Sequence, residues 1–236
     1  MLILVPTAPI AAAAGCADGT TGNDTLTCSV TPTAGNDDDQ FDADLGDDVI
    51  VLQAGVIVVN MDGDGSATHD LRGAGDGGDD TITNYGTVTA SIAGDWASGN
   101  GGNDTIYNYG QVNVNIMGDE VLGVGGDDTI TNAATVENAI HGEGGDDTVI
   151  LTDGADHILL LDGGPGTDVL TFNFSDPNIY DQVETALAGQ SAANGSITIG
   201  GQTYTWTDFE ELRSEAPSAS AASRIITSTR FDGANS

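Results

Sequence analysis

Lysine is absent from the 236-residue chain, and its only cationic side chains are four arginines: Arg72, Arg213, Arg224 and Arg230. Against them stand 37 aspartate and glutamate residues, which give a formal net charge of −33. Nucleic acids and anionic membrane surfaces bind proteins through clustered Lys and Arg. We therefore expect no nucleic-acid partner and no insertion into a membrane.

Aromatic residues are also scarce, at 5% of the chain, although hydrophobic residues make up 39% and glycine contributes 34 residues. The apolar residues are mostly Val, Ile, Leu and Ala. This composition suits thin stacked coils better than the thick core of a conventional globular domain. It favours a repeat architecture.

Glutamate is rare beside aspartate, with 7 Glu against 30 Asp. Acidity that served only solubility would not separate the two so strongly. Asp prefers turns and carries the short carboxylate that turn-borne metal sites use. The skew therefore points to turns and to hard cations.

Residues 1–14 are an apolar run that ends in small residues, which is typical of the end of a secretory signal, with cleavage near Ala14. The run is too short for a membrane span. Cys16 and Cys28, the only two cysteines, follow it closely. An even count in an exported chain favours a disulfide, although a lipid anchor on Cys16 is the alternative. We expect a secreted or cell-surface protein.

A glycine- and aspartate-rich motif recurs along the chain, reading Gly-x-Gly-Gly-(Asp/Asn)-Asp-Thr-(Ile/Val). Its copies occupy residues 75–82, 99–106, 123–130 and 142–149, with a variant at 163–170 and degenerate forms at 22–26 and 46–50. From Asp24 onward the last Asp recurs after 24, 32, 24, 24, 19 and 21 residues. Such self-similarity is the mark of a solenoid, and the irregular steps indicate inserted loops or trimmed corners.

Three columns of apolar residues repeat at 24-residue spacing outside this motif. They are Ile82, Ile106 and Ile130; Val88, Val112 and Val136; and Ile92, Ile116 and Ile140. Apolar and polar residues alternate around them, as in strands with one buried face. We predict an all-β parallel β-solenoid with coils of about 24 residues and three inward-facing segments per coil. Asn84, Asn108 and Asn132 form a fourth column, expected to hydrogen-bond along the stack.

Changes in composition and residue pattern along the sequence predict five segments. Residues 1–14 are a signal-peptide remnant, 15–45 an N-terminal coil holding the Cys16–Cys28 loop, 46–172 the solenoid, 173–213 a small α+β cap, and 214–236 a disordered tail. Within the cap we expect a helix over 179–189, a hairpin around Gly200 and Gly201, and a short helical turn over 209–212. The aromatic residues of this cap would close the end of the solenoid.

The turn motif resembles the RTX, or haemolysin-type, calcium-binding repeat Gly-Gly-x-Gly-x-Asp-x-U-x, in which U is a large apolar residue. Residues 163–170 fit it fully, whereas the four earlier copies carry Asp, Asn, Val or Glu at the second position. The resemblance implies Ca²⁺ bound between neighbouring coils by Asp carboxylates and turn carbonyls. The implied metal-ligating residues are Asp80, Asp104, Asp128, Asp147 and Asp168, their neighbours Asp79, Asn103, Asp127 and Asp146, and the turn glycines Gly78, Gly102, Gly126, Gly145 and Gly166. RTX rolls repeat every nine residues, so one such turn per 24 residues indicates a wider coil.

Electrostatics gives a separate reason to expect a cation. Coils stack about 4.8 Å apart, and like charges at that separation repel by roughly 0.9 kcal/mol in water and about 3.5 kcal/mol at an effective dielectric of 20. Calcium would neutralise a column of Asp. The alternative is that each Asp only caps its own turn.

These observations predict an extracellular calcium-binding solenoid that acts as a structural or adhesive module, with calcium ions and a cell-surface glycan or another surface protein as partners. The chain is predicted not to be an enzyme. A polysaccharide lyase or epimerase is the first alternative, but Lys is absent and His69, His141 and His157 share no column. An ice-binding solenoid is the second, suggested by the Thr-x-Thr triplets at 81–83 and 129–131.

Overall fold

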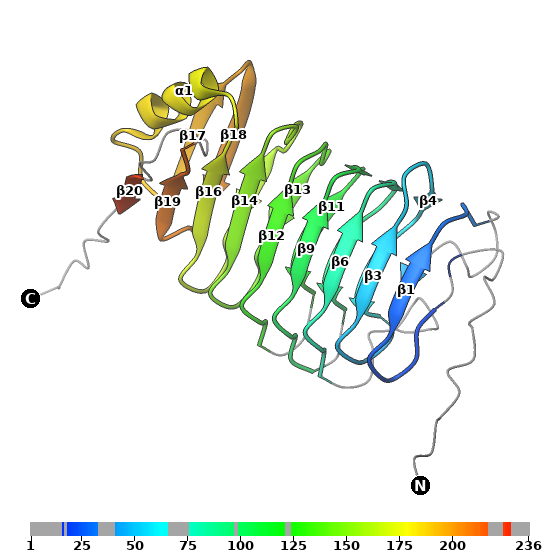
Figure 1. Ribbon diagram of the computed structural model, residues 1–236. Coiled ribbons are helices and arrows are strands. Elements are labelled where there is room, and N and C mark those ends of the chain that lie inside the picture. The colour runs from blue at the N-terminus through cyan, green and yellow to red at the C-terminus, as the bar shows by residue number, and fades with distance from the viewer. Residues whose placement is uncertain are drawn as a thin grey trace, which may run out of the picture.

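The computed structural model describes residues 16, 18–32, 41–65, 76–96, 99–120, 124–216 and 224–227. The expected signal-peptide remnant, and the segment that contains His69 and Arg72, lie outside these residues. The described chain winds into stacked coils whose strands form parallel sheets, a solenoid-like arrangement with α1 at its C-terminal end (Figure 1).

The largest sheet has nine strands and runs the length of the stack. In order, it contains β1 (Thr25–Cys28), β3 (Val49–Leu52), β6 (Thr81–Asn84), β9 (Thr105–Asn108), β12 (Thr129–Asn132), β14 (Thr148–Thr152), β16 (Val169–Asn173), β19 (Glu211–Ser214) and β20 (Arg224–Thr227). Neighbours are parallel from β1 to β19, and β20 is antiparallel to β19.

Two further sheets form the other walls of the coils. The eight-stranded sheet contains β17 (Asn194–Ile199), β18 (Gln202–Thr207), β15 (Leu160–Asp162), β13 (Ala139–His141), β11 (Asn115–Asp119), β8 (Ile92–Asp95), β5 (Met61–Asp64) and β2 (Phe41–Asp42). The three-stranded sheet contains β10 (Gln111–Val112), β7 (Thr87–Val88) and β4 (Ile57–Val58). Three walls per coil agree with the three predicted inward segments.

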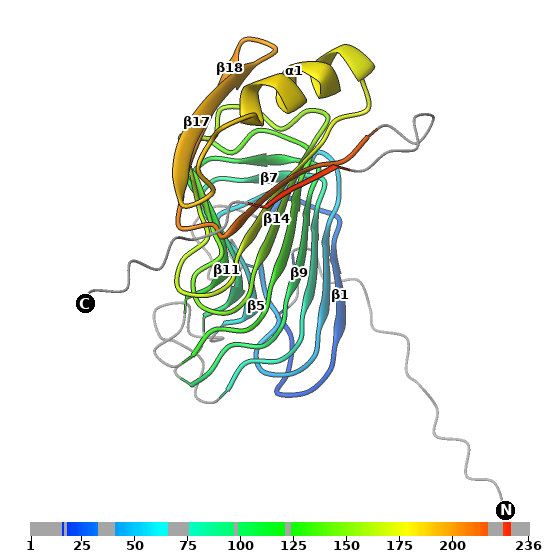
Figure 2. The same ribbon diagram turned by 90° about the vertical axis from the view of Figure 1, so that its left-hand side faces the viewer.

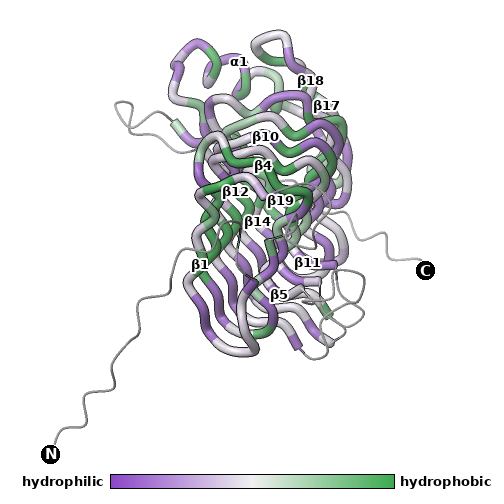
Figure 3. Tube along the Cα trace, turned by 90° about the vertical axis from the view of Figure 1, so that its right-hand side faces the viewer, coloured by the Kyte–Doolittle hydropathy of each residue, from purple (hydrophilic) through white to green (hydrophobic). Residues whose placement is uncertain are grey.

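The core consists of the apolar columns that the sequence predicts. Ile82 pairs with Ile106 and Ile106 with Ile130 in the nine-stranded sheet, and all three are buried. The Val88 and Ile92 columns are likewise paired and buried. Figure 3 shows the coils along the stack, with hydrophobic positions gathered across the middle, around β4, β10, β12 and β14, and hydrophilic positions in the turns at the bottom.

A ladder of asparagines runs beside this core. The side-chain amide of Asn84 donates to Oδ1 of Asn108 over 2.8 Å, and that of Asn108 donates to Oδ1 of Asn132 over 2.7 Å. All three residues are fully buried. The predicted asparagine column is confirmed, and it satisfies the polar groups of buried side chains at the corner where each coil leaves the nine-stranded sheet.

The outer face of the nine-stranded sheet carries threonines in register. Thr83 pairs with Tyr107 and Tyr107 with Thr131, so a tyrosine interrupts the second threonine column. Its ring is parallel to that of Tyr109, with the two centroids 6.4 Å apart. Tyr109 in turn stacks on Tyr85 at 5.2 Å. Tyr107 therefore breaks the flat threonine array, and Tyr85 and Tyr109 stack on each other beside it.

Each end of the stack has its own closure. At the N-terminal end, Cys16 and Cys28 form the predicted disulfide, with their Cα atoms 4.6 Å apart. At the C-terminal end, α1 (Pro177–Leu187) and the hairpin of β17 and β18 lie over the last coils (Figure 2). The helix begins after Asp176, which accepts the amide of Asn178, and it buries Val183 and Leu187.

The hairpin turns at Gly200 and Gly201, which have φ angles of 58° and 89°, conformations that L-residues rarely adopt. Buried Trp206, Phe172 and Tyr204 pack together beneath it, with Phe172 edge-on to both other rings. The helical turn expected over 209–212 is wrong. Glu211–Ser214 is instead strand β19, because it continues the parallel sheet from β16 and buries Leu212.

Strand β20 lies within the segment predicted to be disordered, and residues 217–223 and 228–236 of that segment lie outside the described chain. No helix in the described ranges is long and apolar enough to cross a membrane.

Candidate metal centre

The last aspartate of each turn motif belongs to one continuous column, here called the turn-aspartate column. Its members are Asp48, Asp80, Asp104, Asp128, Asp147 and Asp168, and each stands directly before a strand of the nine-stranded sheet. The backbone amide of each of the first five donates to Oδ1 of the next, over 2.6 to 2.8 Å. One carboxylate oxygen per residue is thus consumed in joining coil to coil.

The other oxygen of every member lacks a hydrogen-bond partner among the described residues. Oδ2 is unsatisfied in Asp48, Asp80, Asp104, Asp128, Asp147 and Asp168, each of which is at most 1% exposed. Burying a carboxylate oxygen without a donor or a counter-charge is costly, and native proteins rarely do so. Six such oxygens along one line are therefore available to a cation or to protons.

A second set of buried carboxylates faces this column from the eight-stranded sheet. These strand-end aspartates are Asp64, Asp95 and Asp119, the last residues of β5, β8 and β11, and each is at most 1% exposed. Their Oδ2 atoms accept the backbone amides of Gly78, Gly102 and Gly126, the last two over 2.6 and 2.7 Å. Their Oδ1 atoms have no hydrogen-bond partner in the described chain.

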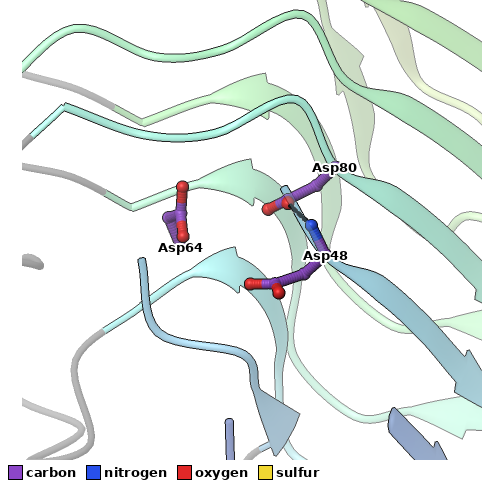
Figure 4. Close-up of side chains that lie close together, drawn as sticks. All are labelled: Asp48, Asp64 and Asp80. Carbon is purple, nitrogen blue, oxygen red and sulfur yellow. Dashed lines mark hydrogen bonds between the residues drawn. The ribbon is translucent and has the colours of Figure 1, made fainter. Parts of the chain in front are cut away.

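The two sets meet in three groups, here called the aspartate triads. They are Asp48, Asp64 and Asp80; Asp80, Asp95 and Asp104; and Asp104, Asp119 and Asp128. In each triad one oxygen from every residue lies within 4.8 Å of the others, so each triad can hold a metal ion. Figure 4 shows the first triad, with Asp48 and Asp80 from successive turns and Asp64 facing them from β5. Asp80 and Asp104 each belong to two triads.

Backbone carbonyls lie close to the same oxygens. A methyl group placed on the α-carbon of Gly94 would overlap both Oδ2 of Asp104 and the carbonyl oxygen of Gly118. Gly63 has the same relation to Asp80 and Gly94. The glycine before each strand-end aspartate therefore leaves room for the carboxylate, and it brings a neutral oxygen of the next coil beside the triad.

Burial governs the protonation of these carboxylates when no cation is bound. It raises the pKa of Asp80 to about 8 and that of Asp128 to about 9, and the facing charges of Asp64 and Asp119 add to the two effects. Burial likewise raises the pKa of Asp95 to about 10 and holds that of Asp104 well above its usual range. In the cation-free folded protein these four carboxyl groups therefore hold protons at neutral pH.

The acidic neighbours of the turn-aspartate column lie elsewhere. Asp79, Asn103, Asp127 and Asp146 are exposed. Each accepts a turn amide of the following coil, as when Asn103 donates to Asp79 and Asp127 to Asn103 over 2.8 and 2.7 Å. They form an exposed ladder that the triads do not include. In this exposed ladder the side chains only accept backbone amides of the turns. This is the capping role that the alternative to calcium binding gave to the turn aspartates.

The turn glycines act through the backbone. Gly78, Gly102 and Gly126 donate their amides to the strand-end aspartates, as described above. A methyl group on Gly102, Gly126, Gly145 or Gly166 would overlap the carbonyl oxygen of the corresponding glycine in the preceding coil. Glycine is needed here because successive backbones approach too closely for a side chain.

The described histidines stand apart from the triads. Nδ1 of His141 lies 3.6 Å from Oδ2 of Asp162, and His157 is an exposed residue beside Glu137 and Asp156.

No family model, curated protein or solved structure matches this chain. Its function must therefore be inferred from the geometry of the triads and from their surroundings.

Proposed function

We propose that this protein is an extracellular calcium-binding β-solenoid with coils of about 24 residues, and that it serves as a structural or adhesive module. The observation that carries the proposal is the row of three aspartate triads with unsatisfied, buried carboxylate oxygens. A cation in each triad would supply the missing partner for these oxygens.

The ligand set favours calcium among the common cations. All the side-chain ligand atoms of the triads are carboxylate oxygens, which hard cations prefer, and neither His nor Cys takes part. Calcium also accepts carbonyl ligands in all-protein sites, whereas magnesium usually keeps several waters.

Charge balance supports one divalent cation per triad. The three triads contain seven different aspartates, because Asp80 and Asp104 are shared. Seven carboxylates and three divalent cations leave a net charge of −1 along the line. Without cations, the same carboxylates would have to take up protons or repel one another inside the coils.

The proposed location outside the cell agrees with the chemistry of the chain. Disulfides persist in oxidising compartments, and Cys16 and Cys28 are joined. The resemblance of the turns to RTX repeats points the same way. In this proposal each site combines turn aspartates with a strand-end aspartate from the eight-stranded sheet. An RTX roll would instead use a second turn of the same kind, and the wider coil accounts for the difference.

An adhesive role is supported by the tyrosines on the outer surface. Tyr85 and Tyr109 are 48% and 47% exposed, and their rings stack with an interplanar angle of 11°. Exposed aromatic rings beside hydroxyl groups suit the binding of a neutral glycan or of a protein surface, because the ring face is apolar and the tyrosine hydroxyl forms hydrogen bonds.

Isothermal titration calorimetry tests the metal proposal directly. Protein freed of metal with a chelator, dialysed and titrated with CaCl₂, is expected to bind at least three calcium ions per chain. MgCl₂ at the same concentration is expected to bind more weakly. Absence of calcium binding to folded protein would overturn the proposal, and an unchanged stoichiometry in Asp104→Asn would show that calcium binds away from the triads.

A further inference from the structure

The turn-aspartate column continues past the last triad. Asp147 and Asp168 follow Asp128 in the same ladder of amide-to-carboxylate hydrogen bonds, both 2.8 Å long. Both residues are at most 1% exposed, and the Oδ2 atom of each lacks a hydrogen-bond partner among the described residues. No strand-end aspartate faces these two, because the positions equivalent to Asp119 hold Glu143 and Gly164.

Asp24, whose backbone amide donates to Oδ1 of Asp48 and so extends the turn-aspartate column at its N-terminal end, shows how the protein satisfies such an oxygen with its own atoms. Oδ2 of Asp24 accepts the backbone amide of Thr20 over 2.6 Å and its hydroxyl over 2.8 Å. At the C-terminal end, Oε2 of Glu210 accepts the amide of Asp168 over 2.9 Å, which closes the backbone ladder. No comparable donor reaches Oδ2 of Asp168 in the described chain. The two ends of the column are therefore built differently.

The connecting turns also become shorter at this end. Nine positions separate Asp119 from Asp128, and in that longer turn the amide of Gly126 covers the strand-end aspartate. Only four positions separate Glu143 from Asp147, and four separate Gly164 from Asp168. The amide of Gly145 donates to the carbonyl of Pro165 rather than to a carboxylate. In the first of these shorter turns the glycine amide therefore satisfies a carbonyl and not a carboxylate, although Asp147 and Asp168 are as buried as the members of the triads.

An acidic cleft lies at this place. Its volume is about 510 Å³, and its lining includes the carboxylates of Glu143, Asp162, Asp208 and Glu210 beside Gly164 and Gly166. A methyl group placed on the α-carbon of Gly163, between the lining residues Asp162 and Gly164, would lie 3.0 Å from Oδ2 of Asp168 and would overlap the carbonyl oxygen of Asp208. The buried, unsatisfied oxygen of Asp168 thus lies next to the segment 162–164 that contributes to the cleft wall, although Asp168 itself is fully buried behind that wall.

We propose that this cleft is a further divalent-cation site of a different kind. Asp147 and Asp168 supply the buried carboxylates. The carboxylates that line the cleft, Glu143 among them, balance the positive charge of the cation, and water completes its coordination. The proposal rests on the proposed function, since the cation is the one that the triads bind. Because the cleft is open to solvent, the ion in it exchanges faster than those in the triads and can offer coordination positions to a ligand from outside.

The test counts calcium ions in chelator-treated, full-length protein by calorimetry. Asp168→Asn keeps an oxygen to accept the amide of Asp147 but removes the charge, and Glu143→Gln removes a charge at an exposed position where folding is not threatened. Each is expected to lower the count by one calcium ion per chain. Asp146→Asn is the matched control, because Asp146 lies in the same turn on the exposed ladder and accepts the amide of Thr167 over 2.8 Å.

Terbium luminescence provides a second readout. Trp206 lies two residues before Asp208 and pairs in register with Leu161, next to Asp162, whereas Trp96 follows the strand-end aspartate Asp95. In a Trp96→Phe background, emission excited through tryptophan is expected to report the cleft and to be lost in Glu143→Gln. An unchanged calcium count and unchanged emission in both cleft variants would overturn the cleft site while leaving the triads intact. Loss of all binding in the wild type would instead overturn the proposed function.

Discussion

The backbone amide of Asp104 donates a 2.7 Å hydrogen bond to Oδ1 of Asp128, while Oδ2 of the same carboxylate has no partner in the described chain. One oxygen therefore holds successive coils together and the other remains for a cation. This division explains why the column requires Asp and not Glu. A longer side chain would not hold one oxygen against the neighbouring turn while placing the other in the triad.

Asp104→Asn tests this division, because asparagine retains the oxygen that accepts the amide of Asp80 and loses the charge shared by two triads. We expect opposite effects under two conditions. In calcium, loss of two sites lowers the free energy of unfolding by up to about 5 kcal/mol, at about 2.7 kcal/mol per site when calcium is a hundredfold above its dissociation constant. In chelator, the variant unfolds at a higher temperature than the wild type, because it lacks a buried carboxyl group that must take up a proton when the chain folds.

Asp127→Asn is the control for that comparison. Asp127 lies on the exposed ladder, and the equivalent position of the preceding coil already holds Asn103, so an amide is compatible with the turn. Its melting temperature in calcium and in chelator is expected to follow the wild type. Thermal unfolding monitored by circular dichroism measures both, and a loss of stability in calcium equal to that of Asp104→Asn would contradict the assigned roles.

The pH dependence of stability follows from the raised pKa values. Burial raises the pKa of Asp48 to about 6, that of Asp147 to about 7 and that of Asp80 to about 8, against about 4 for an unfolded chain. Between these limits the folded protein binds more protons than the unfolded one, so without calcium its stability falls as the pH rises from about 4 to 8.

Calcium is expected to abolish this fall, because it binds the deprotonated carboxylates and releases their protons. Thermal unfolding curves recorded at pH 5 and pH 8, in chelator and in calcium, test the sign, and loss of the folding transition at pH 8 in chelator is the limiting case of the expected fall. Calorimetry in two buffers of different ionisation enthalpy measures the protons released. A chelated protein more stable at pH 8 than at pH 5 would contradict the prediction.

The sequence predicted those parts of the fold that recur at fixed spacing. Ile106, Asn108 and Asp104 were assigned correctly to the core, the asparagine ladder and a column of turn aspartates, because stacking places residues 24 positions apart on top of one another. The exposed partners Asn103 and Asp127 share that periodicity, so spacing alone did not separate them from the buried column.

The strand-end aspartates were missed for a different reason. Asp95 and Asp119 approach Asp104 from the opposite wall, a contact set by how the coil closes and not by any local motif. A signal was present in the sequence, since Gly94-Asp95 and Gly118-Asp119 repeat 24 positions apart, and each Asp follows a turn aspartate by 15 positions. Strand β19 was missed because Glu211–Ser214 pairs with β16, some forty residues earlier in the chain.

The register of the core gives a further prediction. Ile106 is fully buried between Ile82 and Ile130, whereas its neighbour Thr105 points outward and is only partly buried. Ile106→Asp is expected to cost several kcal/mol, because it buries an unpaired charge among apolar side chains. Thr105→Asp is expected to cost less than about 1 kcal/mol. Denaturant titration in calcium compares them, and equal losses would refute the register.

The disulfide is expected to stabilise the N-terminal coil and little else. Cys28 ends β1, which pairs only with β3 in the described sheet, so this strand has a single neighbour. Reduction of a loop of about this length removes roughly 3 kcal/mol from the part that it closes. Hydrogen exchange after reduction is expected to accelerate at Leu26 and to stay unchanged at Ile106. Two free thiols in unreduced protein, or a lipid on Cys16, would contradict the bond.

Calcium is also expected to decide whether the chain folds at all. Three sites at about 2.7 kcal/mol each amount to about 8 kcal/mol, which is comparable with the whole stability of a typical domain. The net charge of −33 acts against the compact state, and the small apolar side chains of each coil bury little surface to oppose it. At cytoplasmic calcium levels we therefore expect a loose chain at pH 8, and at the millimolar levels outside cells a rigid, protease-resistant rod.

Limited proteolysis and far-UV circular dichroism during a calcium titration at pH 8 test this coupling. Strand signal and protection are expected to rise together, in one cooperative transition, because Asp80 and Asp104 each contribute to two triads and link their occupancy. Asp104→Asn should move the transition to higher calcium, whereas Asp127→Asn should leave it in place. If the chelated wild type already resists protease and gives the full strand signal at pH 8, the triads bind calcium without controlling folding, and the rod would form before export.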